Sequence, residues 1–183
     1  MKKIFIFLSC ITVFLLTQSC NNQNESNNAE VKSDNALLLP QELEDVDHAL
    51  LISYTSSFDG ENSFSDYLTK NFSSLSDLNI LNDEKLNIKD HVIIQDAALD
   101  ELFDILYKQG CSDDLVGNCF TPNHAVVYYD SNNKVMGYTE ICFDCITSVS
   151  SQNIPTLKLC NSKMNQLMDF MKKHNVTYFD HVI

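Results

Sequence analysis

Two apolar runs rich in β-branched and aromatic residues, 119–130 and 135–145, flank a short polar turn at residues 131–134. This pattern is typical of a β-hairpin, in which a tight turn joins two antiparallel strands. His124, Glu140 and several cysteines lie on or beside this segment. We therefore expect the hairpin to organise the rest of the fold.

The length of the hairpin loop decides which residues face each other. A three-residue loop pairs Asp130 with Lys134 and His124 with Glu140. Asn133 can adopt the left-handed backbone conformation that such a loop needs, so the sequence favours this register. Directly paired residues have Cβ atoms about 5 Å apart, so His124 and Glu140 are expected to be cross-strand neighbours.

The favoured register also assigns the two faces of the hairpin. The face expected to meet the helices carries Ala125, Val127, Tyr129, Val135, Thr139, Ile141 and Phe143. The other face carries His124, Val126, Tyr128, Met136, Tyr138, Glu140 and Cys142. A loop of two or four residues would instead put His124 opposite Ile141 and separate it from Glu140 and Cys142, because a one-residue slip exchanges the faces.

Two amphipathic helices are predicted in the second half of the chain. Residues 97–108 have apolar side chains at helical spacing, with Asp96 as the expected N-cap and Gly110 after the C-terminus. Their apolar face consists of Leu99, Leu102, Phe103, Leu106 and Tyr107. A C-terminal helix at residues 163–173 is expected to follow the N-cap Asn161. Its apolar face consists of Met164, Leu167, Met168 and Met171.

Weaker patterns complete the predicted fold. They are a helix start at Pro40, a strand at 49–57, a short helix at 64–71, a short strand at 86–88, a polar loop at 146–155 and a last strand at 156–160. The fold class is therefore α+β. We expect a small antiparallel sheet centred on the hairpin, with the two amphipathic helices packed on one face. A single domain would span residues 37–183.

The N-terminus has the pattern of an export signal. Two lysines precede an apolar segment, residues 4–16, which suits a signal peptide and is short for a membrane-spanning helix. The segment ends at Thr17-Gln18-Ser19-Cys20, after which the chain turns polar. This resembles the signal of a bacterial lipoprotein, in which residues 1–19 are removed and Cys20 is acylated. The alternative is an ordinary secretory signal in which Cys20 is incidental.

The lipoprotein resemblance implies a place and a partner. Several acyl chains on Cys20 would give stable insertion in a lipid bilayer, so the protein is expected at the bacterial cell envelope, on a periplasmic or cell-surface face. Residues 20–36 are rich in Asn and have little to bury, which predicts a disordered tether reaching on the order of 20 Å.

Charge and composition exclude several function classes. The chain of 183 residues has a formal net charge of -13 and so lacks a basic patch for nucleic acid or for an anionic membrane surface. It contains four glycines and no glycine-rich phosphate loop. A protein partner is compatible with the composition, but the sequence does not identify one.

The cysteines are the main candidates for chemistry. Of seven, Cys10 lies in the signal and Cys20 at the lipid, which leaves Cys111, Cys119, Cys142, Cys145 and Cys160. One interpretation is structural, because disulfides form outside the cytoplasm and stabilise small domains. A second is a zinc site, because Cys142 and Cys145 with Cys119 or Cys160 and His124 would form a tetrahedral thiolate and imidazole set. A third is thiol–disulfide exchange at Cys142 and Cys145, although Asp144 between them opposes thiolate formation.

The spacing of Cys142 and Cys145 predicts where the second hairpin strand ends. In an extended strand, residues three apart point to opposite faces and have Cα atoms about 10 Å apart. A disulfide needs a separation below about 7 Å. The two cysteines can therefore share a bridge or a metal only if the strand stops near Phe143, and we predict that it does.

From Asp96 onward the layout resembles a family of uncharacterised bacterial secreted proteins and lipoproteins. The shared features are a helix, a Cys-Phe-x-Pro-x-His motif at 119–124, an aromatic hairpin, an Ile-Cys-Phe-x-Cys motif at 141–145 and a short helix entered from Cys160. The resemblance implies no activity and assigns no catalytic residue. The sequence therefore favours a membrane-anchored, non-enzymatic module stapled by its cysteines, with a zinc-binding protein or a thiol–disulfide exchange protein as alternatives.

Overall fold

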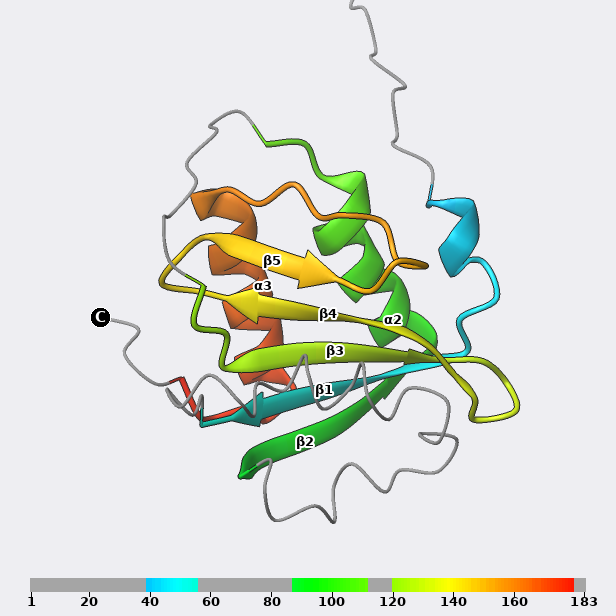
Figure 1. Ribbon diagram of the computed structural model, residues 1–183, viewed down its shortest axis with the longest axis horizontal. Helices are drawn as coiled ribbons and strands as arrows, with labels where there is room; N and C mark the ends of the chain where they lie inside the picture. Colours follow the sequence, from blue (N-terminus) through cyan, green and yellow to red (C-terminus); the bar gives the residue numbers. More distant parts are fainter. Residues whose placement is uncertain (1–38, 56–86, 112–119, 180–183) are drawn as a thin grey trace, which may run out of the picture. The chain divides into compact units, whose positions relative to one another are not determined.

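The computed structural model describes residues 39–55, 87–111 and 120–179 of the chain (Figure 1). The predicted signal peptide, the tether with Cys20, the predicted helix at 64–71 and Cys119 lie outside these residues. The described residues belong to one compact unit of the chain.

A five-stranded antiparallel sheet forms the centre of this unit. Its strand order is β2-β1-β3-β4-β5 (Figure 1). The strands are β1 His48–Tyr54, β2 Ile88–Gln95, β3 His124–Tyr129, β4 Val135–Cys142 and β5 Thr147–Ser150. The predicted strand at 49–57 corresponds to β1, and the predicted hairpin corresponds to β3 and β4.

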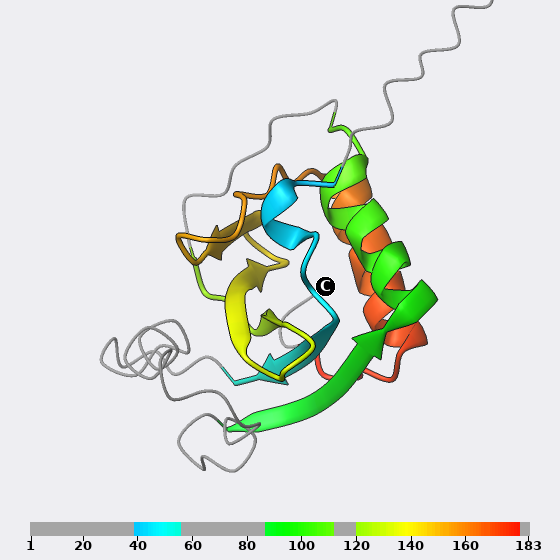
Figure 2. The ribbon, with the colours of Figure 1, turned by 90° about the vertical axis from the view of Figure 1, so that its right-hand side faces the viewer.

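Both predicted helices pack on the same face of this sheet, as Figure 2 shows from the side. The first is α2 Asp96–Phe103, which continues without a break into the π-helical turn η4 Asp104–Lys108. The second is α3 Asn161–Lys173, and a short 3-10 helix, η1 Gln41–Leu43, stands at the predicted helix start. The α+β fold class is confirmed.

The core between the sheet and the helices draws on every strand except β5. Strands β1, β3 and β4 place Leu51, Val126 and Ile141 in this core, where each is fully buried. Leu102 of α2 and Leu167 of α3 pack in the same core. At about 25 cal/mol per Å² of buried apolar surface, such side chains supply most of the stabilisation.

The opposite face of the sheet is buried as well. Leu50 and Ile52 of β1, with Ala125 and Val127 of β3, are fully buried in a second apolar cluster. All residues of β1 and β3 are therefore buried, which explains why these strands are apolar on both faces.

The hairpin turn forms as predicted. The amide of Asp130 donates to the carbonyl of Lys134 at 3.0 Å, and Asn133 has a φ of 59°. The three-residue loop and its left-handed asparagine are thus both present.

The predicted register beyond the turn is wrong. Tyr129 pairs with Val135 but Tyr128 pairs with Gly137, so Met136 is an extra residue in β4, a β-bulge. From there on every pair is displaced by one position. His124 lies opposite Ile141 and not opposite Glu140.

The bulge also changes the face assignment for β3. Thr139, Ile141 and Phe143 of the second strand point toward the helices, as expected. In β3, however, Val126 and Tyr128 face the helices. The opposite face carries Ala125, Val127 and Tyr129, together with Val135 at the start of β4. The predicted faces of β3 are wrong because the bulge interrupts the ladder of pairs that begins at the turn.

Several other boundaries differ from expectation. Strand β2 runs far beyond the predicted 86–88, and its exposed residues Lys89, His91 and Ile93 alternate with the half-buried Ile88, Asp90 and Val92 at the edge of the sheet. Strand β5 lies in the predicted loop 146–155, and the predicted strand 156–160 has no regular structure. The N-cap positions belong to Gln95 and Cys160, one residue before the predicted Asp96 and Asn161.

Gly137, next to the bulge, offers a test of how tightly β4 packs against the chain after β5. A Cβ atom there would collide with Ile154 and lie 2.6 Å from the hydroxyl oxygen of Ser151. We expect Gly137→Ala to lower the free energy of unfolding by about 1–3 kcal/mol, as overpacking does, measured by urea denaturation. Gly110→Ala is the matched control, since nothing lies within 4 Å of its added Cβ. Equal stability of the two variants would contradict this packing.

Candidate functional site

The Cys142 and Cys145 pair closes the end of β4. The strand ends at Cys142, and residues 143–146 form the turn that leads into β5. The two Cα atoms are 5.2 Å apart and the sulfurs form a disulfide. The predicted strand end near Phe143 is confirmed. The turn forces Ile146 to a φ of 49°, a strained conformation for a β-branched residue.

A buried carboxylate accompanies this disulfide. Glu140 precedes Cys142 by two residues in β4 and so points to the same face, about 6.6 Å along the strand. Glu140 is fully buried and accepts a hydrogen bond of 2.8 Å from the hydroxyl of Tyr54. Burial first, and then the charge and hydrogen bond of Glu140, raise the pKa of Tyr54 well above its usual value. A negative carboxylate here disfavours a thiolate at Cys142.

His124 lies on the other face of the sheet, among aromatic rings. Its ring centroid is 4.9 Å from that of Phe143 and 4.7 Å from that of Phe179. The Nε2 atom donates to the backbone carbonyl of Tyr178 at 2.8 Å. Burial lowers the pKa of His124 to about 4, so the ring is neutral at pH 7. His124 thus joins β3 to the segment after α3.

Asp90 of β2 holds the same segment by its backbone. Its carboxylate accepts hydrogen bonds from the amides of Thr177 at 2.8 Å and Tyr178 at 2.7 Å, and from the hydroxyl of Ser53 at 2.9 Å. Although partial burial opposes it, these hydrogen bonds lower the pKa of Asp90. Together with His124, this carboxylate fixes the chain end that leaves α3.

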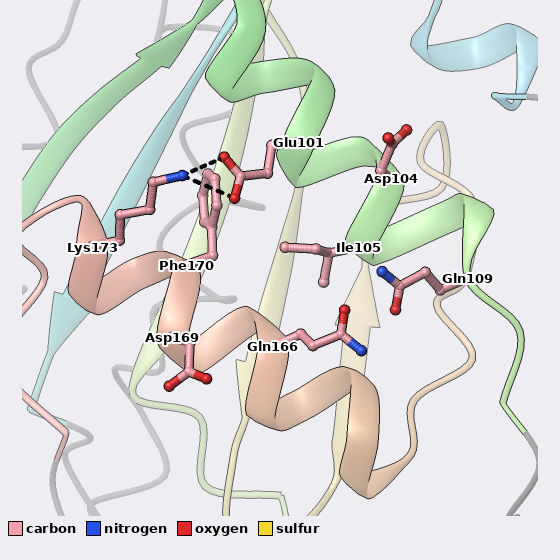
Figure 3. A pocket seen from close by; sticks show the side chains of 8 residues that line it. All are labelled: Glu101, Asp104, Ile105, Gln109, Gln166, Asp169, Phe170 and Lys173. Atoms are coloured by element: carbon pink, nitrogen blue, oxygen red, sulfur yellow. Dashed lines mark hydrogen bonds and ion pairs between the residues drawn. The ribbon is translucent and has the colours of Figure 1, made fainter.

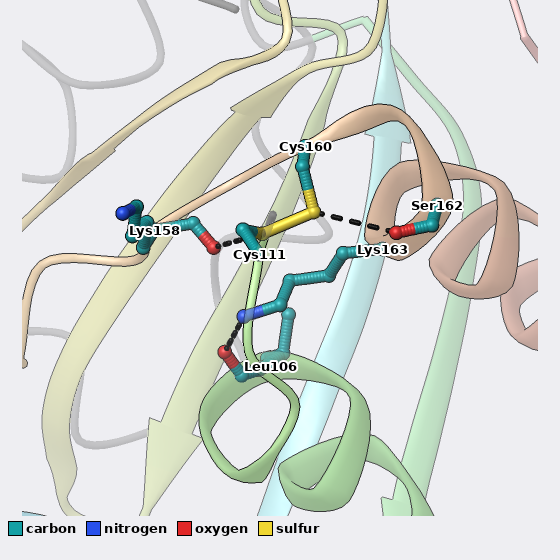
Figure 4. The surroundings of a disulfide bond; sticks show 6 residues. All are labelled: Leu106, Cys111, Lys158, Cys160, Ser162 and Lys163. Carbon is teal, nitrogen blue, oxygen red and sulfur yellow. Dashed lines mark hydrogen bonds between the residues drawn. A yellow bond between two sulfur atoms is a disulfide. The ribbon is translucent and has the colours of Figure 1, made fainter. Parts of the chain in front are cut away.

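A second disulfide links the two helices. Cys111 follows η4, and Cys160 is the N-cap of α3; their Cα atoms are 5.7 Å apart (Figure 4). The two residues are 49 positions apart in sequence, against 3 for Cys142 and Cys145. In the chain-entropy model a loop of the first length stabilises by about 4 kcal/mol and one of the second by about 2 kcal/mol. The helix link is therefore the stronger staple.

The predicted zinc ligands do not gather in the part of the chain that the structure describes. Cys142 is bonded to Cys145, Cys160 is bonded to Cys111, and His124 lies on the opposite face from Cys142. Cys119 lies outside the described residues. Within residues 39–55, 87–111 and 120–179, no group of three or more His, Cys, Asp or Glu side chains is arranged to hold a metal ion.

The described residues also line surface grooves, of which two are well formed. One, of about 410 Å³, lies between α2–η4 and α3 (Figure 3). Its charges are largely paired, since Lys173 binds Glu101 at 2.7 Å and Asp104 pairs with Lys108. The other, of about 500 Å³, lies between η1 and the β3–β4 turn and is lined by Glu42, Asp45, Asp130, Lys134, Val135, Met136 and Asn153.

Lys163 is the site residue that the sequence argument missed. It is only 3% exposed, although lysine is rarely buried, and its Nζ donates to the carbonyl of Leu106 in η4 at 2.9 Å. The signal was present in the spacing, because Lys163, Leu167 and Phe170 repeat at i, i+4 and i+7 on the buried face of α3.

Comparisons with known proteins give no match, either to a family model, to a curated protein or to a solved structure. Among the described residues, no helix is both long and apolar enough to cross a membrane.

His124 predicts a pH dependence of stability. Its pKa is about 4 in the folded protein and about 6.5 when unfolded, so the unfolded state binds the extra proton between these values. The contribution of His124 to the unfolding free energy is fully present above pH 6.5. It is lost as the pH drops toward 4, by about 3 kcal/mol in all. We expect His124→Phe to remove this part of the pH dependence of the unfolding free energy. His91→Gln, at an exposed position of β2, should leave it intact. An unchanged profile in His124→Phe would contradict the buried neutral imidazole.

Proposed function

We propose that this protein is a lipid-anchored module of the bacterial cell envelope, stabilised by disulfides and without enzymatic activity of its own. The pairing of Cys111 with Cys160 is the observation that carries the proposal. Disulfides persist in oxidising compartments and are rare in the cytosol. The two disulfides therefore support the envelope location that the export signal at residues 1–20 predicts.

The anchor and the folded unit have separate roles in this proposal. Acylated Cys20 holds the chain to the lipid bilayer, and residues 20–36 act as a tether of on the order of 20 Å. The unit from about residue 37 then works close to the membrane. Its acidic charge keeps it from adhering to anionic lipid headgroups, so a surface is free to meet a partner.

The absence of enzymatic activity is proposed from how the titratable side chains are used. Glu140 binds Tyr54, Asp90 holds two backbone amides and Nε2 of His124 holds the Tyr178 carbonyl. Each of these groups ties one chain segment to another. These hydrogen bonds contribute to the stability of the fold. A side chain that reacted with a substrate would have to break its hydrogen bond and lose that contribution.

The anchor predicts the behaviour of Cys20→Ala. Without the thiol, no acyl chain can be attached, so we expect loss of the protein from the membrane fraction or failure of signal removal. Fractionation and immunoblotting of cells expressing the full chain measure both. Cys10→Ala is the control, because it alters a cysteine of the signal without touching the acylation site. A Cys20→Ala chain that stays membrane-bound and normally processed would contradict the proposal.

Counting thiols separates a stapled module from a zinc protein. We expect Cys111, Cys142, Cys145 and Cys160 to react with an alkylating reagent only after reduction of the protein purified from the envelope. Zinc, measured on the same sample by mass spectrometry, should be absent. Stoichiometric zinc that is released when these four cysteines are alkylated without prior reduction would establish the metal site instead.

A further inference from the structure

We propose that the Cys111–Cys160 disulfide is an exchange site: an external thiolate attacks the sulfur of Cys111, and Cys160 leaves as a stabilised thiolate. From the sequence, exchange at Cys142 and Cys145 is one of three interpretations, and this proposal places exchange at the other disulfide instead. The inference goes beyond the anchored module and does not depend on it, because the chemistry can be measured on the purified chain.

The two sulfurs differ in access. Cys160 is fully buried, whereas Cys111 is partly exposed at the end of the helical segment. Thiol–disulfide exchange requires the attacking thiolate to approach one sulfur. Access therefore selects Cys111 as the sulfur that is attacked and Cys160 as the leaving group.

The position of Cys160 suits a leaving thiolate. It is the N-cap of α3, a helix of 13 residues, and its sulfur lies 3.4 Å from the hydroxyl oxygen of Ser162 (Figure 4). The first backbone amides of a helix point their hydrogens at the N-cap, and the helix dipole favours negative charge there. Cysteine thiols in this position ionise more readily than free cysteine.

Lys163 adds a positive charge at the same helix end. Figure 4 shows its side chain running beside the disulfide toward the carbonyl of Leu106. A cation in the first turn of a helix is opposed by the dipole, and burial opposes it further and lowers the pKa of Lys163. In the oxidised form the carbonyl of Leu106 is its hydrogen-bond partner, and the disulfide carries no charge. A thiolate at Cys160 would add a negative charge at the same helix end, so the placement of Lys163 favours the reduced form.

The surroundings of the other disulfide have the opposite character. Cys142 and Cys145 are 2% and 1% exposed, so neither sulfur is open to attack. Asp144 lies between them, and Glu140 points to the same face of β4 as Cys142. Both carboxylates oppose a leaving thiolate. This disulfide is therefore expected to resist exchange.

The exchange balances with a dithiol as the co-reactant. Its first thiolate bonds to the sulfur of Cys111 while the bond to Cys160 breaks and the electron pair leaves on Cys160. Its second thiolate attacks the first sulfur, releases Cys111 as a thiolate and leaves the reductant as a disulfide. The partner class is thus a dithiol reductant, and the result is release of α3 from the end of η4.

The test is a time course on the full chain, purified in detergent, with the neutral monothiol 2-mercaptoethanol. Acid quenching, alkylation and peptide mass spectrometry identify which disulfide opens and which sulfur carries the adduct. We expect Cys111–Cys160 to open first, with the adduct on Cys111 and Cys160 as the free thiol. Earlier opening of Cys142–Cys145, or an adduct mainly on Cys160, would overturn the proposal.

A second measurement tests the role of Lys163. Lys163→Met keeps the length of the side chain and removes the charge, so we expect slower opening of Cys111–Cys160. A thiol of lower pKa leaves faster, so a rise in the pKa of the Cys160 thiol should slow the reaction. Lys158→Met is the matched control, because it removes an exposed lysine just before Cys160. If Cys111–Cys160 opened at the same rate in both variants, the charge of Lys163 would have no role in the exchange. The identity of the attacked sulfur is tested separately, by mapping the adduct on the unaltered chain.

Discussion

In the ladder between β3 and β4, Met136 has no partner, and the pairs between it and the end of β4 are displaced by one position. This bulge determines the side of the sheet on which each polar group lies. His124 is turned toward the helices, where it meets Phe143, Phe179 and the chain after α3. Glu140 and Cys142 are turned to the opposite face. The sheet thereby separates the imidazole of His124 from the carboxyl group of Glu140 and the sulfur of Cys142.

The two disulfides differ in what they constrain. Cys142 and Cys145 close a turn that β4 and β5 already define, so their bond constrains only a short segment of the chain. Cys111 and Cys160 join the ends of two helices that otherwise meet through side chains such as Lys173 and Glu101. Loss of the Cys111–Cys160 bond would free the start of α3. The other end of the helix would still be held by the apolar core and by the hydrogen bond between Asp90 and the amide of Tyr178.

Much of this fold could be predicted from the sequence, because the signals were local. The helical spacing of residues 97–108, the asparagine of the turn and the Cys-x-x-Cys spacing each reflect a constraint acting over a few residues. The bulge at Met136 and the edge strand β2 could not be predicted in this way. Next to Met136, Gly137 lies against the side chain of Ile154, a contact between segments distant from the turn, and Lys89 to His91 gain a strand conformation by pairing with β1. Likewise, nothing in the sequence indicated that Cys160 would be paired with Cys111.

Two opposing influences act on the redox equilibrium of the Cys111–Cys160 disulfide. By linkage, a disulfide that stabilises the fold by about 4 kcal/mol is itself stabilised by the fold to the same degree, which lowers its reduction potential by about 90 mV. The N-terminus of α3, Ser162 and Lys163 act in the other direction, because they stabilise the thiolate form of Cys160. Glu140 and Asp144 give the other disulfide no such compensation. In the oxidised protein the buried Lys163 has the carbonyl of Leu106 as its hydrogen-bond partner, and ionised Cys160 would add a negative charge at the same helix end. Access to Cys111 and the charges at the start of α3 thus separate a disulfide suited to exchange from one that is closed to it.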